Sequence, residues 1–317
     1  MSSDSQIINK IRVDNTFFSF IEEEVCDGLD ISAKDFFKSL SQILNELQEK
    51  NTSLLEKRDL LQSKIDQWHA ENKRIDLQSY KKFLEGIEYI TPIPDKFSID
   101  VEEVDDEISQ IAGPQLVVPI TNQRFVLNAV NARWGSLFDS LYGTNVIPNK
   151  GSMSTSFAHN LQRVNLTAEL ACDFLDEIAP LKGGSYRQIT SQVKYSSALI
   201  FNLNDGELAT LINPEKYIGL TDDGHILLKN NNLHLEVVCD QERSLHKSGI
   251  FDVILESAIT TIVDFEDSAS TVSNEEKIHA YRNYLGLMKR ELSTTFTKGG
   301  ETITRTLNED KVCTDID

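Results

Sequence analysis

The chain has 317 residues, of which 40% are hydrophobic and 26% are charged. This composition suits a folded protein with a sizeable core, and the length predicts two or three domains at about 150 residues each. Fifty acids against 31 bases give a net charge of -19. So acidic a surface repels nucleic acid and anionic membranes, and we expect neither as a partner, although a few well-placed arginines can still hold one compact anion.

The cysteine pattern and the N-terminus predict a reducing compartment. The cysteines, Cys26, Cys172, Cys239 and Cys313, lie far apart and form no CxxC pair, which argues against a zinc site or a disulfide framework. The stretch MSSDSQIINKIRVD has no apolar signal core, and no run approaches the ~18 apolar residues of a membrane span. We therefore expect a cytoplasmic protein with free thiols.

Residues 32–90 carry apolar side chains at helical spacing. Asn51 and Thr52 separate two apolar runs, and their residue types suit a turn followed by a helix N-cap. The pattern predicts a helical hairpin rather than one long rod. The apolar pattern is too short and irregular to favour a partner-binding heptad coil, so we interpret residues 32–90 as an intramolecular helical clamp.

A proline-containing stretch separates this helical part from the rest of the chain. TPIPDKF at 91–97 and the acidic VEEVDDE that follows it predict a linker. The apolar run QLVVPI at 115–120 is closed by a proline and predicts a buried parallel strand. Residues 122–143, which include Arg124, are helical in composition.

The second half of the chain changes to strand character. Residues 193–240 read as strands with DDG and NNN as turn signals, and they predict an α/β insertion. An apolar strand at 258–263 follows, and residues 275–292 carry Ile278, Tyr281, Leu285 and Met288 on one helical face. Strand, acid-rich loop and helix together predict one β/α unit.

Three carboxylates follow the predicted strand at 258–263, namely Asp264, Glu266 and Asp267. In parallel α/β folds, ligands gather at the carboxyl ends of strands. Acids this close raise one another's proton affinity unless a cation or an arginine neutralises them, so they predict a counter-charge, with Mg²⁺ as one candidate. A turn with a helix cap at Asp267 or Ser268 explains the same residues, and the spacing alone favours that simpler explanation.

Longer motifs resemble a known family. They are GPQLVVPITNQRFVLNAVNARWGSLFDSLYGTN at 113–145, ESAITTIVDFEDS at 256–268, AYRNYLGLMKREL at 280–292 and TKGGETITRTLNED at 297–310. Together they resemble malate synthase, specifically its long G isoform, and the match runs from the N-terminal helices to the last residue. The resemblance implies an α/β fold with an N-terminal helical clasp, the early strands of a TIM (β/α)8 barrel and an inserted α/β domain.

The resemblance also implies an order of domains along the chain. It consists of the helical clasp at 1–90, a first barrel segment at 91–134, the inserted α/β domain at 135–257, a barrel β/α unit at 258–295 and a truncated return into the α/β domain at 296–317.

Members of this family condense glyoxylate with acetyl-CoA and water to give malate and CoA, in the glyoxylate cycle. The resemblance implies Mg²⁺ on the glyoxylate aldehyde, an aspartate base at the acetyl methyl and an arginine that stabilises the enolate. It places Asp264 and Glu266 at the barrel mouth as supporting catalytic residues, and we assign no metal ligand. It places acetyl-CoA at Val117, Arg124, Phe125, Ser268 and Arg305.

Malate synthases of the G type are considerably longer than this chain. It stops at VCTDID, 312–317, before the segments expected to carry the catalytic arginine, the catalytic aspartate and the principal Mg²⁺ ligands. We therefore expect an N-terminal part of a typically monomeric enzyme, inactive alone and active with a second chain that carries the rest of the barrel. The alternatives are a noncatalytic CoA-binding or interaction module and a nonfunctional remnant.

Overall fold

The computed structural model describes residues 5–155, 160–194, 198–311 and 313–315. It divides the chain into two compact units, residues 1–102 with 271–279 and residues 103–270 with 280–317. Within the described residues no helix is both long enough and apolar enough to cross a membrane. Each unit is taken separately below.

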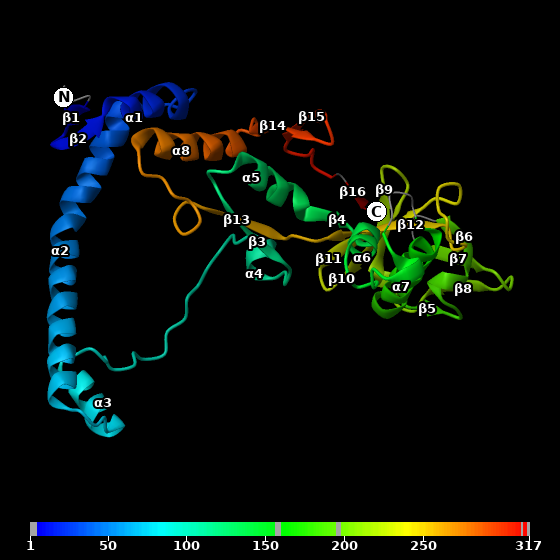
Figure 1. Ribbon diagram of the computed structural model, residues 1–317, viewed down its shortest axis with the longest axis horizontal. Coiled ribbons are helices and arrows are strands. Elements are labelled where there is room, and N and C mark those ends of the chain that lie inside the picture. Colours follow the sequence, from blue (N-terminus) through cyan, green and yellow to red (C-terminus); the bar gives the residue numbers. More distant parts are fainter. Residues whose placement is uncertain (1–4, 156–159, 195–197, 312, 316–317) are drawn as a thin grey trace. The chain divides into compact units, whose positions relative to one another are not determined.

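The first unit is a β-hairpin followed by helices (Figure 1). The Asp14 carboxylate caps the first helix by accepting hydrogen bonds from the N–H groups of Thr16 and Phe17, at 2.9 and 3.3 Å. The Phe37 ring of the long helix lies 5.7 Å from the ring of Phe18, so aromatic packing joins the two helices. The elements are β1 Ser5–Ile8, β2 Ile11–Asp14, α1 Asn15–Phe20, a π-helical turn Ile21–Val25, α2 Ala33–Glu71, α3 Leu77–Gly86 and the first part of α8 Asn274–Met288.

Helix α2 continues through Asn51 and Thr52 without a break, so the predicted turn at these residues is wrong. Each costs a helix only about 0.5 kcal/mol relative to alanine, and their Glu, Lys and Leu neighbours favour helix. The chain reverses instead after Asn72, and α3 packs on the end of α2 through the Trp68 ring, 4.6 Å from that of Tyr80. The apolar side chains expected to face a second long helix are exposed, namely Ile43, Leu44, Leu47, Leu54, Leu55 and Leu60.

Residues 91–105, which include the predicted linker, contain no helix or strand. The second unit begins in this stretch. Its elements are α4 Asp106–Ser109, β3 Gln115–Pro119, α5 Gln123–Val130, β4 Trp134–Ser136, α6 Leu137–Gly143, α7 Leu161–Ile178, β5 Leu181–Lys182, β6 Ile189–Lys194, β7 Leu199–Leu203, β8 Leu208–Leu211, β9 Tyr217–Thr221, β10 Ile226–Asn230, β11 Leu233–Cys239, β12 Ile250–Glu256, β13 Thr260–Asp264, the last part of α8, β14 Ser293–Lys298, β15 Glu301–Thr306 and β16 Cys313–Asp315.

Strands β3 and β13 form a parallel pair in which Val117 lies opposite Ile262. One face of the pair packs on α5, in a core that includes Ile120 and Leu127. On the other face Val117 is 61% exposed and Ile262 is 50% exposed, so the prediction that these strands are buried is wrong for that face. The reason is that this sheet has two strands within the described residues, and a parallel sheet is buried only where layers cover both its faces.

The elements from β4 to β12, residues 134–256, are called the inserted region below. With β16 they form two antiparallel sheets that share one hydrophobic core with α7. One sheet has four strands in the order β5-β8-β7-β6, and the other has six in the order β16-β9-β10-β11-β12-β4. Figure 1 shows α6 and α7 gathered with these strands. The core includes Ala171, Leu175, Phe201, Ile226 and Val253, all 1% exposed or less.

The turn signals in this region are confirmed. Asn231 and Asn232 connect β10 to β11 with positive φ values of 50° and 64°, a conformation that asparagine tolerates in tight hairpins. Gly224 of the DDG sequence also has a positive φ, 75°. The predicted strand that begins at Val193 corresponds to β6 and β7, with residues 195–197 outside the described ranges.

Three strands of the six-stranded sheet, β4, β12 and β16, lie outside residues 193–240, the segment predicted to have strand character. Strand β4 lies within the stretch predicted to be helical and pairs with β12, where Trp134 lies opposite Glu256. Strand β16 pairs with β9, with residues 312 and 316–317 outside the described ranges. The C-terminal stretch thus returns to the sheet of the inserted region.

Helix α8 corresponds to the predicted helix at 275–292 but ends four residues earlier, at Met288. Its predicted apolar face is wrong in part, because Tyr281 and Met288 are 45% and 60% exposed. Arg290 has a positive φ of 61°, which ends the helix before the hairpin of β14 and β15 begins.

Candidate functional site

The second unit contains every residue that the resemblance assigns to ligand binding or catalysis. Val117 lies on β3, and Arg124 and Phe125 lie in the first turn of α5. Asp264 ends β13, Glu266 and Ser268 lie in the loop after it, and Arg305 lies on β15.

A polar network fixes the turn from β3 into α5. The Asn122 side chain accepts a hydrogen bond from the N–H of Phe125 at 3.1 Å and caps the helix. The buried Asn283 of α8 donates to the carbonyl of Ile120 at 2.9 Å and accepts from the Gln123 side chain at 2.8 Å. The position of Arg124 at the start of α5 therefore follows from bonds made on both sides of it.

The hairpin of β14 and β15 places Phe296 and Arg305 on the same face. Thr294 lies opposite Arg305, and Phe296 lies opposite Ile303. Since side chains alternate between faces along a strand, these residues share one face, and all of them are less exposed than their neighbours in the sequence. Gly299 and Gly300, both with positive φ, form the turn.

Arg124 and Arg305 converge on the ring of Phe296. The guanidinium carbon of Arg124 lies 4.1 Å from the ring centroid, and that of Arg305 lies 5.3 Å from it. These distances are typical of cation-π contacts. Two of the predicted residues, distant in the sequence, are thus brought together by a third residue that sequence reasoning missed.

Neither Arg124 nor Arg305 forms an ion pair with any residue that the structure describes. By contrast Arg133, Arg187 and Arg290 each pair with an acid, at 2.8, 2.6 and 2.9 Å for the shortest contacts with Glu256, Glu169 and Asp310. Two guanidinium groups left without acids in a chain with a net charge of -19 suit an anionic ligand.

Asn131, at the end of α5, connects the helix to the residues that follow the hairpin. Its side-chain amide donates to the carbonyl of Thr306 at 2.8 Å and accepts from the N–H of Asn308 at 2.9 Å. Because α5 carries Arg124 and the hairpin carries Arg305, these bonds help to set the separation of the two arginines.

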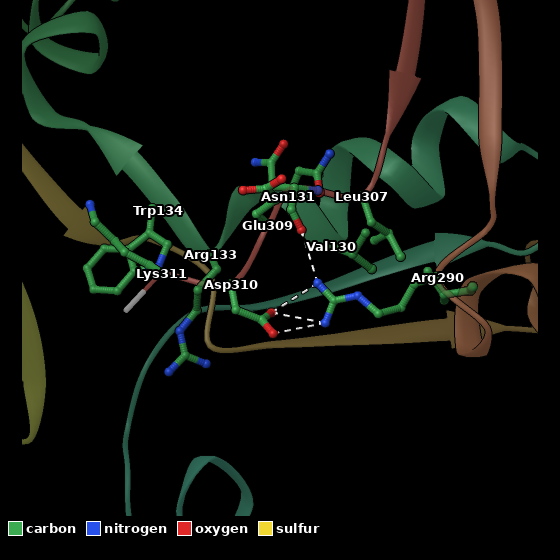
Figure 2. A pocket seen from close by; sticks show the side chains of 11 residues that line it. Val130, Asn131, Arg133, Trp134, Arg290, Leu307, Glu309, Asp310 and Lys311 are labelled. Atoms are coloured by element: carbon green, nitrogen blue, oxygen red, sulfur yellow. Dashed lines mark hydrogen bonds and ion pairs between the residues drawn. The ribbon is translucent and has the colours of Figure 1, made fainter. Parts of the chain in front are cut away.

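A cavity of about 330 Å³ adjoins Asn131, and Figure 2 shows its lining residues. The cations in this cavity are neutralised. The Arg290 guanidinium bonds both carboxylate oxygens of Asp310, which lowers the pKa of Asp310, and Lys311 pairs with Glu236 while it lies over the Trp134 ring. This cavity is therefore a weaker anion site than the unpaired arginines at Phe296.

The Asp264 carboxylate closes the loop that follows β13. It accepts hydrogen bonds from the hydroxyl and the N–H of Ser268, both at 2.6 Å, and from the N–H of Glu266 at 2.9 Å. The Ser268 hydroxyl, helped by these N–H groups, lowers the pKa of Asp264 to about 2. Asp264 thus shapes the loop, and no helix cap comes from Ser268, since α8 begins at Asn274.

The other predicted residues are less constrained. Glu266 is exposed and takes part in the loop through its N–H group. Phe125 is 52% exposed, and Val117 lies on the open face of β3. Among the described residues, no hydrogen bond or ion pair links the Asp264 loop to the two arginines.

The described residues do not form a metal site by themselves. They include no group of three or more His, Cys, Asp or Glu side chains that could hold a metal ion. The Asp264 oxygens are already engaged by Ser268 and Glu266. We therefore derive no step through a metal ion on these residues.

Sequence patterns of two known domains match the chain. One, described as the malate synthase N-terminal domain, matches residues 16–74, and the other, the alpha-beta insertion domain of malate synthase G, matches residues 159–230.

Known proteins match it over almost its whole length. Malate synthase G of Halalkalibacterium halodurans is 41% identical over 312 residues, which are 96% of this chain and 43% of that protein. Malate synthase G of Corynebacterium glutamicum is 40% identical over 318 residues, 95% of this chain and 42% of that protein. The chain therefore belongs to the malate synthase G family, and it spans less than half the length of these relatives.

Proposed function

We propose that this chain supplies the acetyl-CoA-binding part of a malate synthase, which condenses glyoxylate with acetyl-CoA and water to give malate and CoA. The observation that carries the proposal is the pair Arg124 and Arg305, which converge on Phe296 without an acid partner in the described part of the chain. The membership of the malate synthase G family supports the same assignment.

The chemistry of CoA fits this pair. Its phosphates offer several acceptor oxygens, and guanidinium groups bind phosphate through charge-assisted hydrogen bonds worth roughly 1.5 to 3 kcal/mol each. In the loop after β13 the Ser268 hydroxyl donates to Asp264, so its oxygen lone pairs can accept a hydrogen bond from the ligand. In this proposal Asp264 orients Ser268, and Val117 and Phe125 offer exposed apolar surface to the thioester end.

The catalytic steps belong to other segments in this proposal. The resemblance assigns the base, the enolate-stabilising arginine and the principal Mg²⁺ ligands to the part of the longer relatives that this chain does not span. Asp264 and Glu266 are proposed to act only by supporting that site. The proposal therefore needs the remaining part of the enzyme, on the same or on a second polypeptide, with glyoxylate bound mainly by the residues of that part.

Binding is tested by titration calorimetry of the purified chain with acetyl-CoA. Arg124→Ala and Arg305→Ala should each raise the Kd by about 10-fold or more. Arg58→Ala is the matched control, because Arg58 lies on α2 in an ion pair whose side chains are both 68% exposed. Absence of acetyl-CoA binding by the unmodified chain would refute the proposal.

Activity is tested by the release of free CoA thiol in the presence of glyoxylate and Mg²⁺. The chain alone should show no turnover, and addition of a second chain with the missing part of the enzyme should give turnover of about 1 per second or more. The alternative is a noncatalytic CoA-binding module, favoured by an arginine pair formed entirely within this chain. It predicts binding without turnover in both assays.

A cytoplasmic location is part of the proposal. Its support is that the cysteines Cys26 and Cys172 are free thiols, as expected in a reducing compartment. Buried in the inserted region, Cys172 has a pKa raised to about 12, so this thiol is unreactive at neutral pH.

A further inference from the structure

We propose that Phe296 is a positioning residue for the anion site, because its ring holds the guanidinium groups of Arg124 and Arg305 together. The inference rests on the proposed function and goes beyond it, since it assigns a role to an apolar side chain that no motif marks as ligand-binding.

The first argument for this role is the geometry of the three side chains. Arg124 comes from α5 and Arg305 from β15, and the Phe296 ring lies within 4.1 Å of one guanidinium carbon and 5.3 Å of the other. The ring face of phenylalanine carries negative electrostatic potential and attracts a cation without neutralising it. An acid in the same place would neutralise the arginines and compete with the ligand.

The charges give a second argument. Two unpaired guanidinium groups near each other repel, and in the absence of a fixed attractor each would extend into water. The chain has 50 Asp and Glu residues, any of which, placed within reach, could have formed an ion pair with Arg305. In the described residues Arg305 forms no such pair and lies over the ring instead.

Packing alone does not account for Phe296. The hydrophobic core beneath α5 consists of other residues, with Ile120, Val126 and Leu127 fully buried and Leu292 and Leu307 beside them. Phe296 is only half-buried and its contacts include the two arginines. Its aromatic ring, rather than its apolar volume, is the property that this environment uses.

The test compares two substitutions by titration calorimetry with acetyl-CoA. Phe296→Leu keeps an apolar side chain but removes the ring, and it should raise the Kd about 10-fold. Phe296→Tyr keeps the ring and should stay within about 2-fold of the unmodified chain. Phe296→Met replaces Phe296→Leu if the leucine variant melts at a lower temperature than the unmodified chain.

The inserted region offers a matched control. The Arg243 guanidinium lies 4.1 Å from the centroid of the Phe251 ring, the same distance as Arg124 from Phe296, but Arg243 also has Asp240 as an acid partner. Phe251→Leu removes an equivalent contact at another place and should leave the Kd for acetyl-CoA unchanged.

A variant without the arginines separates positioning from a general structural effect. In the background Arg124→Ala with Arg305→Ala, Phe296→Leu should cause no further loss of affinity, because the ring then has no cation to hold. An equal loss in both backgrounds would overturn the inference. So would unchanged affinity of Phe296→Leu while the arginine variants bind weakly, an outcome that leaves the proposed function intact. Failure of the unmodified chain to bind acetyl-CoA overturns both.

Discussion

Arg163 shows how one buried cation can organise a loop. Among the described residues it is the largest fully buried side chain, with 0% exposure. Its guanidinium donates to the carbonyls of Tyr142, Thr144 and Met153 at 2.8, 2.7 and 2.8 Å, and to that of Pro148 at 3.3 Å. The guanidinium spreads its N–H donors over a planar fork and so reaches carbonyls on several sides, whereas the donors of a lysine ammonium all lie on one nitrogen atom.

We predict that Arg163→Lys lowers the free energy of unfolding by about 3 kcal/mol or more, because buried carbonyls lose their donors and each unsatisfied group costs about 1 to 3 kcal/mol. Urea denaturation followed by circular dichroism measures the change. Arg58→Lys is the control on the exposed face of α2 and should stay within about 0.5 kcal/mol. A loss below about 1 kcal/mol for Arg163→Lys would show that water replaces the guanidinium.

Asp264 predicts a pH dependence at the candidate site. Its pKa in the folded chain is lowered to about 2 from a usual 3.8, chiefly by the Ser268 hydroxyl and then by N–H groups of the loop. A lowered pKa means that the carboxylate stabilises the folded loop above pH ~4 and that this contribution is lost as the pH falls through about 2. Carbon NMR titration of the Asp264 carboxyl group should give this low midpoint.

The matched variant for Asp264 is Ser268→Ala, which removes the strongest of its hydrogen bonds and should raise the pKa of Asp264. It leaves the bond from the N–H of Glu266 in place. A midpoint for Asp264 that stays the same in both proteins would mean that the hydroxyl does not bond the carboxylate in solution.

At the scale of elements, α2 is held by its ends rather than by a partner along its length. Ser32 caps its N-terminus by accepting from the N–H of Asp35 at 3.2 Å. At its C-terminal end the Trp68 ring packs on Tyr80 and on Phe83 of α3. Between them the exposed middle depends on helix propensity and on the continuity of its hydrogen bonds.

This arrangement predicts opposite effects at two polar residues of the helix. Ser32→Ala removes the cap and should cost about 1 kcal/mol. Thr52→Ala replaces a residue of lower helix propensity in the middle of α2 and should raise stability by about 0.5 kcal/mol. Thermal unfolding monitored by circular dichroism at 222 nm measures both. A destabilising effect of Thr52→Ala would instead support the turn that the sequence predicted.

The sequence correctly predicted those strands and turns that depend only on residues close together in the chain. The strands at Gln115–Pro119 and Thr260–Asp264 and the turns at Asn231 and Gly224 follow from residue type and short spacing. Strand β4 was missed because its pairing partner β12 lies about 120 residues later. The hairpin in α2 was predicted wrongly because Asn51 and Thr52 are weak helix breakers that their neighbours override.

The candidate site was also predictable only in part, because its residues come from separate parts of the sequence. The motifs placed Arg124 and Arg305, and the structure brings them together. Phe296 could have been found from the alternation of STTFTK and ETITRT about a Gly-Gly turn, which puts Phe296 and Arg305 on one face. The sequence did not predict that the Asp264 carboxylate would be engaged by its own loop. That contact depends on the path of the backbone after β13, which residue types alone do not specify.

At the scale of the whole molecule, the chain combines two sheets that share a buried core with a parallel strand pair that has one exposed face. The inserted region buries a core between its sheets and α7, and strands from three separate segments of the sequence complete its six-stranded sheet. The pair β3 and β13 has no further strand at either edge within the described residues. Its open face presents Val117 and Ile262.

We predict that this open face makes the isolated chain associate with itself, because unpaired strand edges next to exposed apolar side chains favour edge-to-edge contacts. Ile262→Lys should reduce the association seen by sedimentation velocity at increasing protein concentration. The melting temperature should change by less than about 3 °C, since Ile262 is already 50% exposed. The reason for choosing lysine is that a charge on an edge strand opposes such contacts.

Ile212→Lys is the control for this prediction, because Ile212 is 61% exposed in the inserted region, away from β3 and β13. It adds the same charge and should leave the association unchanged. The remaining part of the enzyme, added as a second chain that covers β3 and β13, should suppress association in the same way as Ile262→Lys. If the isolated chain sediments as a monomer at every concentration, or if Ile212→Lys acts as strongly as Ile262→Lys, the open face is not the surface that drives association.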